Sequence, residues 1–193
     1  MTDRLTLWNA ALALLEQPAL ATAEGDTMAA NECRTWYGLV RQGLIRAYPW
    51  SFALRRALLP ADATPPAFGW LRAFPWPAGA LAIVTVDGLD DDAWTIEGNA
   101  VLTDAPAPLT VRYLADVVEE GLFDPVFADA LVIALARRIA PRLARSDRAV
   151  MDRLAGELQA TVEAGWRADA IFNNADLRTP PADAGDDWAR IGL

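Results

Sequence analysis

Apolar residues near both ends of the chain recur every three or four positions, the spacing that places side chains on one face of an α-helix. The first such face predicts a helix over residues 3–17, and its members are Leu5, Trp8, Leu12 and Leu15. We expect a second helix from a cap at Asp26 or Thr27 to about Tyr48, because these side chains accept hydrogen bonds from a first helical turn. Its apolar face consists of Cys33, Trp36, Tyr37, Val40, Leu44 and Ile45.

The pattern changes between Trp50 and Asp116, where short apolar runs alternate with turn residues. Extended segments are expected at 52–59, 69–76, 81–86, 93–97, 100–103 and 109–114. Gly98-Asn99 joins two of them and is a two-residue hairpin signal. Turns this close together favour antiparallel sheet, because parallel strands need a long crossover between them.

Helical spacing returns at Asp124-Pro125, which combines a good N-cap with proline at the first helical position. The buried face expected for this helix is Phe127, Leu131, Ala134, Leu135 and Ile139. Pro141 should kink or break the helix near its end. A last helix, capped by Ser146 or Asp147, is expected to reach about Phe172, with an apolar stripe of Met151, Leu154, Leu158, Val162 and Trp166.

Residues 174–193 are rich in Pro, Asp and Gly and are too polar to bury a core of their own. We expect an extended C-terminal arm that Trp188, Ile191 and Leu193 anchor on a partner. The alternative is a frayed terminus. The predicted fold is therefore α+β: a bundle of about four helices from residues 1–49 and 119–173, an inserted antiparallel β subdomain at 50–118, and the arm. The first pair of helices would pack on the last pair.

Charge and composition narrow the possible functions. All 17 basic residues are arginine and the net charge is −9, which opposes non-specific binding to DNA, because such binding depends on basic side chains that neutralise phosphates. Charged residues interrupt every long apolar run, so no membrane contact is expected. The first residues lack the positive stretch of a secretory signal. The one cysteine, Cys33, has no partner for an intramolecular disulfide.

The chain also lacks residues that most enzymes use. Without His there is no Ser–His or Cys–His pair and no imidazole ligand, and without Lys there is no Schiff base. The two serines, Ser51 and Ser146, lie outside any Gly-x-Ser-x-Gly turn. We therefore predict no enzyme, no catalytic residue, no cofactor and no metal site. Asp87, Asp90, Asp91 and Asp92 form the best carboxylate cluster, but their spacing is not that of a calcium loop, and a solvated turn explains them.

The eight tryptophans are more than a core of this size requires. Trp and Arg are the residues that dominate protein interfaces. We therefore take Trp50 and Trp76, beside the three anchors of the arm, as candidate partner-binding residues. Each could instead be a core or loop anchor.

Several strings, in order along the chain, resemble the tail tubular protein A family of short-tailed phages. Residues 46–55 read RAYPWSFALR and resemble the Arg-x-x-Pro-Trp-x-Phe-Ala pattern that links helix to sheet in that family. The further matches are FPWP at 74–77, IEGN at 96–99, LTD at 102–104, VRY at 111–113 and FDPVF at 123–127. The resemblance covers roughly residues 5–172 and leaves out the arm.

The resemblance implies a structural head-to-tail adaptor that forms a ring, of about twelve copies, between the portal protein and the tail nozzle or tail tube protein. Such a ring seals the packaged genome and lines the channel through which double-stranded DNA later passes without specific binding. It implies a place at the head–tail junction of the virion after synthesis in the host cytoplasm.

Two other functions stay open beside the adaptor. One is a DNA-contacting packaging or regulatory protein that uses Arg34, Arg41 and Arg46 of the second helix, which an adaptor would instead carry as a solvated or intersubunit flank. The other is a metal-dependent hydrolase that uses the carboxylates at 87–92.

Overall fold

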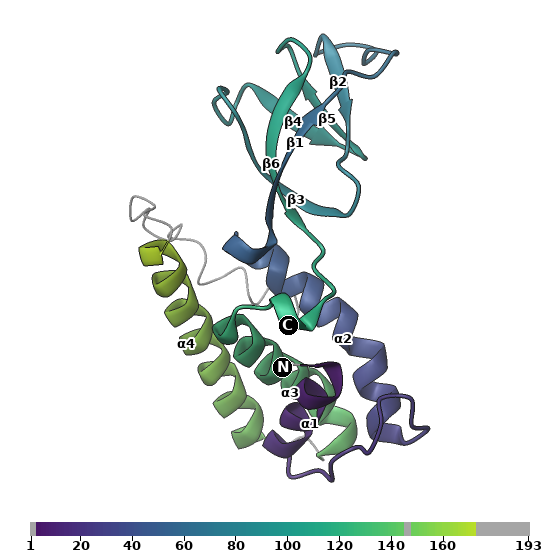
Figure 1. The fold of residues 1–193 in the computed structure, drawn as a ribbon, viewed down its shortest axis with the longest axis vertical. Helices are drawn as coiled ribbons and strands as arrows, with labels where there is room; N and C mark the ends of the chain where they lie inside the picture. Colours follow the sequence, from purple (N-terminus) through teal and green to yellow (C-terminus); the bar gives the residue numbers. More distant parts are fainter. Residues whose placement is uncertain (1–2, 145–147, 173–193) are drawn as a thin grey trace. The chain divides into compact units, whose positions relative to one another are not determined.

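A computed structural model of the protein describes residues 3–144 and 148–172. The fold is α+β, with 48% of residues in helices and 20% in strands. The chain divides into two compact units (Figure 1). The helical unit takes in the described residues up to Phe52 and from Val117 onward, and the β unit is Ala53–Asp116. The expected β subdomain, 50–118, was slightly too long, because its first residues complete the helical unit.

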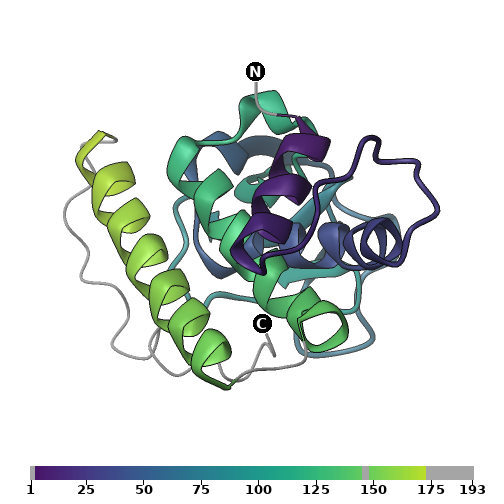
Figure 2. The ribbon, with the colours of Figure 1, turned by 90° about the horizontal axis from the view of Figure 1, so that it is seen from below.

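The helical unit contains α1 (Arg4–Leu14), α2 (Met28–Ala47), α3 (Pro125–Leu143) and α4 (Arg148–Phe172). Helix α3 lies among the other three and contacts each of them (Figures 1 and 2). We expected the first two helices to pack as a pair on the last two. Instead, α1, α2 and α4 each pack on α3. The reason is the sequence of α3, in which all positions from Leu131 to Ala136 are buried, and a helix that is apolar on all sides packs in the interior.

The predicted caps form where the structure describes them. Thr27 accepts a hydrogen bond from the N–H of Ala30 at 3.1 Å and begins α2. Asp124 accepts from the N–H of Val126 at 2.8 Å and begins α3. Helix α3 ends at Leu143, two residues after Pro141. The expected caps of α4, Ser146 and Asp147, lie outside the described residues.

Helix α1 ends earlier than its apolar spacing predicts. Its last residue is Leu14, and Glu16 has a φ of 57°, which turns the chain out of the helix. Asn9 fixes the loop that follows, because its side chain accepts from the N–H of Leu20 at 2.7 Å and donates to the carbonyl of the same residue at 3.1 Å. The chain therefore leaves the helix at Glu16, before it reaches Pro18, and Asn9 holds the loop beyond.

The β unit consists of six strands, each within a segment that the sequence predicts to be extended or within a residue of it. They are β1 (Leu54–Leu59), β2 (Arg72–Pro75), β3 (Ala80–Val86), β4 (Trp94–Glu97), β5 (Ala100–Thr103) and β6 (Leu109–Ala115). They form two antiparallel three-stranded sheets, of order β1-β6-β3 and β2-β5-β4. The predicted hairpin is present: Glu97 pairs with Ala100, and Gly98 has the positive φ of 56° that this turn requires.

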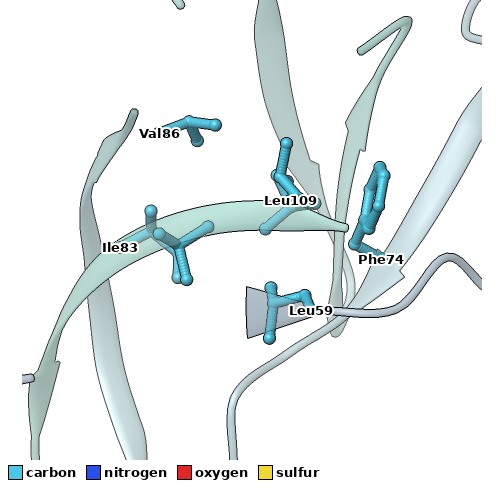
Figure 3. Close-up of a cluster of buried hydrophobic side chains, with 7 residues drawn as sticks. Leu59, Phe74, Ile83, Val86 and Leu109 are labelled. Carbon is cyan, nitrogen blue, oxygen red and sulfur yellow. The ribbon is translucent and has the colours of Figure 1, made fainter. Parts of the chain in front are cut away.

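The core of the β unit is a cluster of seven buried apolar side chains that both sheets contribute. Phe74 and Val101, which are direct cross-strand partners, come from the second sheet. Figure 3 shows Leu59 and Leu109 of the first sheet beside Phe74, with Ile83 of the same sheet further along the cluster. Alternate residues of β1 and β6 therefore point into this core, and the residues between them form an outer face of the sheet.

Candidate interaction surfaces

The strings at 46–55 and 123–127, far apart in sequence, meet in an aromatic cluster of the helical unit. The ring of Phe52 lies 5.8 Å from that of Phe123 and 4.9 Å from that of Phe127, measured between centroids. The ring of Trp50 lies 5.3 Å from that of Phe127 and 5.3 Å from that of Tyr48. The segment that leaves the helical unit and the one that returns to it are thus held together by contacts between aromatic rings, edge-to-face or tilted.

Trp50 is part of this core and has 1% of its surface exposed. Its indole N–H donates to the carbonyl of Leu44 at 3.0 Å. Trp76 is half-buried against the β core, and its indole N–H donates to the carbonyl of Ala80 at 2.9 Å. Both side chains therefore have structural contacts within the protein itself. The anchors expected in the arm, Trp188, Ile191 and Leu193, lie outside the described residues.

The three arginines of α2 do not form one basic surface. Arg41 has only 7% of its surface exposed, so its expected place on a solvated or intersubunit flank was wrong. Arg41 follows Val40 and lies four residues after Tyr37, so the helical repeat of α2 turns its side chain toward the interior. Arg34 donates to the carbonyls of Ala23 and Gly25 at 2.9 and 3.1 Å, and so holds the loop before α2. Of the three, only Arg46 is exposed and forms no hydrogen bond or ion pair with the described residues.

A polar cluster in the helical unit joins α1, α2 and the 3-10 turn η2 (Glu120–Leu122). The carboxylate of Glu120 accepts from Arg4 at 3.1 Å and from the hydroxyl of Tyr37 at 3.3 Å. Burial, with the charge of Glu120 beside it, raises the pKa of the Tyr37 hydroxyl above its ordinary value. Sequence patterns did not reveal this cluster, because its members are up to 116 positions apart.

Helices α2 and α3 are joined at the surface by a second polar group. The guanidinium of Arg138 lies 3.9 Å from the centroid of the Trp36 ring. Glu32 accepts from the Trp36 indole at 3.2 Å and forms an ion pair with Arg142 at 3.1 Å. Trp36 and two of the arginines of α3 thus serve packing between helices.

The carboxylates at 87–92 lie in the turn between β3 and β4, and all four are exposed. Within the described part of the chain, no three His, Cys, Asp or Glu side chains gather in a way that could hold a metal ion. The turn itself is organised by main-chain bonds, with the N–H of Ala93 donating to the carbonyl of Asp90 at 3.0 Å. This geometry is that of a solvated connection between strands.

The outer face of the β1-β6-β3 sheet carries two arginines on adjacent strands. Arg56 of β1 and Arg112 of β6 are direct cross-strand partners, so both side chains are on this one face. Both are exposed, and neither forms an ion pair with a carboxylate of the described residues. Leu58, two residues after Arg56 on the same face, has 67% of its surface exposed. Thr85 and Thr110 are beside the arginines in the register.

The helical unit has a shallow groove of about 480 Å³ between α1, α3 and α4. Its lining includes the apolar Leu14, Val132 and Ile133 and the acidic Asp129 and Glu157. Other large apolar side chains of this unit are exposed outside the groove: Met28, Leu39, Val118 and Leu122. Isolated apolar residues on a surface are common, and a contiguous apolar patch is what marks an interaction site.

Over the described ranges, none of the helices is both long and apolar enough to span a bilayer. Comparison of the chain with models of known protein families gives no match, and comparison with curated proteins gives none either.

Proposed function

We propose that this protein is a structural adaptor of the head–tail junction of a phage particle, assembled as a ring of about twelve copies between the portal and the tail nozzle or tail tube protein. In this proposal it has no catalytic role and no cofactor. Double-stranded DNA passes through the ring without specific binding, and the protein reaches the virion after synthesis in the host cytoplasm.

The observation that carries the proposal is the aromatic cluster around Phe52. Two of the strings that resemble the tail tubular protein A family, 46–55 and 123–127, meet there. In this chain they mark the positions where a β unit is inserted into a helical unit. A resemblance that coincides with one structural junction supports the family more strongly than the same strings scattered over the fold.

The surfaces of the helical unit are consistent with assembly. Leu39 of α2 has 60% of its surface exposed and Met28, at the start of the same helix, has 59%. Burial of such residues against a neighbouring copy contributes about 25 cal/mol for each Å² removed from water. We therefore place the contact between copies on the helical unit, with α2 as part of it.

The test is assembly on the portal of the phage that encodes the chain. Purified full-length protein is mixed with purified portal rings and imaged by negative-stain electron microscopy. We expect added ring density below the portal, and we expect Leu39→Asp to prevent it while the circular dichroism spectrum stays unchanged. Ala13→Asp, at another exposed helical position, is the matched control and should assemble. A wild-type chain that remains a monomer and leaves the portal bare would refute the proposal.

The arm has its own test within the same assay. A chain that ends at residue 174 should keep its helical circular dichroism and lose affinity for the portal, if residues 175–193 reach the portal or a neighbouring copy. Portal affinity equal to that of the full chain would remove the arm from the proposal and leave the ring untouched.

A further inference from the structure

The arrangement of Arg56 and Arg112 is unfavourable for the isolated β unit. Like charges on directly opposed residues of an antiparallel pair repel each other and destabilise the sheet. The two side chains are exposed on the outer face of β1-β6-β3, in a protein of net charge −9, and yet no carboxylate of the described residues pairs with either of them. Two guanidinium groups on adjacent strands form a site for two carboxylates, which arginine binds through two parallel hydrogen bonds each.

The neighbours of this pair define what else the ligand must carry. Leu58 is on the same face and is largely exposed, so it offers an apolar contact beside the charges. Thr85 and Thr110 add hydroxyl groups that donate or accept. Asp87 is close in the register, since its N–H donates to the carbonyl of Thr110 at 2.9 Å, but its carboxylate forms no ion pair with either arginine. The matching ligand is an acidic segment with a large apolar side chain next to its carboxylates.

The chain itself contains one such segment. Residues 183–188 read DAGDDW, with two adjacent carboxylates directly before a tryptophan. We propose that the outer face of the β1-β6-β3 sheet is a docking site for residues 183–188 of this protein. Asp186 and Asp187 neutralise Arg56 and Arg112, and Trp188 covers Leu58 and stacks on a guanidinium group. From Phe172, where α4 ends, an extended chain reaches residue 186 over about 45 Å, at about 3.3 Å for each residue.

Photo-crosslinking of the full chain tests this site. Trp188 is replaced by p-benzoylphenylalanine, the protein is irradiated, and the linked peptides are identified by mass spectrometry. We expect links to peptides that contain 54–59 or 109–115. A product of monomer size identifies docking within one copy and a product of dimer size identifies docking on a second copy, and either supports the site. Links confined to other surfaces, the acidic turn at 87–92 included, would overturn it.

Charge variants separate docking from loss of the fold. Arg56→Thr with Arg112→Thr should reduce the crosslinked fraction at least tenfold, while the urea midpoint of unfolding stays equal or rises, because the repulsion is removed. Arg55→Gln, one position along β1 and outside the proposed face, should leave the crosslink at the wild-type level. The full exchange, with both arginines changed to Asp and both Asp186 and Asp187 changed to Arg, should restore it.

The same variants distinguish the arm from a nucleic-acid backbone as the ligand. If a fluorescent DNA duplex loses affinity in the two-Thr variant, while the exchange of charges fails to restore the crosslink, the face binds phosphate and the proposal is wrong. Because these measurements use the protein without a portal, failure here leaves the adaptor proposal standing. Failure of ring assembly would likewise leave this site to be judged on its own results.

Discussion

Gly165 of α4 faces the indole of Trp50 so closely that no side chain fits between them. A Cβ atom placed on Gly165 would lie 2.8 Å from Cη2 and 3.0 Å from Cζ3 of Trp50. Trp50 is fully buried and bonded to the carbonyl of Leu44, so it has little freedom to move away. The glycine is therefore what permits α4 to approach the aromatic cluster.

Gly165→Ala should destabilise the helical unit by about 1–3 kcal/mol, the usual cost of overpacking a filled core. Gly156→Ala in the same helix is the control, because nothing lies within 4 Å of a Cβ at that position. There, the better helix propensity of alanine should raise the free energy of unfolding by up to about 1 kcal/mol. Urea denaturation followed by circular dichroism measures both. Equal effects of the two substitutions would show that Trp50 does not limit the approach of α4.

Removal of the N-cap of α3 should also be measurable. Asp124→Ala leaves the N–H groups of Val126 and Phe127 without their side-chain acceptor and should cost about 1 kcal/mol of unfolding free energy. Asp129→Ala, an exposed position further along the same helix, should change it by less than about 0.5 kcal/mol. A loss confined to Asp129→Ala would contradict the assigned start of the helix.

The surface contact between α2 and α3 is open to a double-mutant cycle. Trp36→Leu and Arg138→Gln, made singly and together, should reveal a coupling energy of about 0.5–1 kcal/mol, the range for a cation–π contact at an exposed site. Glu32 forms an ion pair with Arg142 nearby, and because the Arg142 side chain is 67% exposed, the coupling of that pair should be smaller and should weaken at high salt. Additive effects of Trp36 and Arg138 would mean that the stacked geometry contributes nothing.

The stability of the protein should fall as the pH rises above about 9. Burial, with a smaller contribution from the charge of Glu32, raises the pKa of the Cys33 thiol from 9.0 to about 11. Between these two values the unfolded chain releases a proton that the folded chain retains, so the folded state loses stability as pH increases. The burial of Tyr37 raises its pKa as well and acts in the same direction at higher pH.

Urea denaturation at several pH values from 8 to 10.5 tests this dependence. Cys33→Ala should flatten the decline in its lower part, and Tyr37→Phe should affect only its upper part. Alkylation of Cys33 at pH 8 should be slow in the folded protein and fast in urea, since the thiol is buried. Rapid labelling of the native chain would place Cys33 at the surface and contradict the structure of α2.

The spacing of apolar residues was sufficient to predict the helices and strands, because the period of the apolar positions differs between a helix and a strand and can be read from neighbouring residues. Asp124-Pro125 and Gly98-Asn99 are examples in which a few adjacent residues determine a start or a turn. The same reasoning failed for Arg41, which lies at a helical position next to the apolar face and is buried there. Its surroundings come from other elements, and periodicity along α2 carries no information about them.

For Trp50 and Trp76, composition suggested a partner where the fold itself supplies the contacts, because a count of tryptophans cannot distinguish an interface from a core. The amino-acid sequence alone determined the elements, their order and the chemistry that the chain lacks, since these depend on residue types and local spacing. Only the tertiary structure decided that α3 is central, that Glu120 meets Arg4 and Tyr37, and that Arg56 faces Arg112. Each of these depends on burial or on strand register between segments that are distant along the chain, and such contacts form only when the whole unit folds.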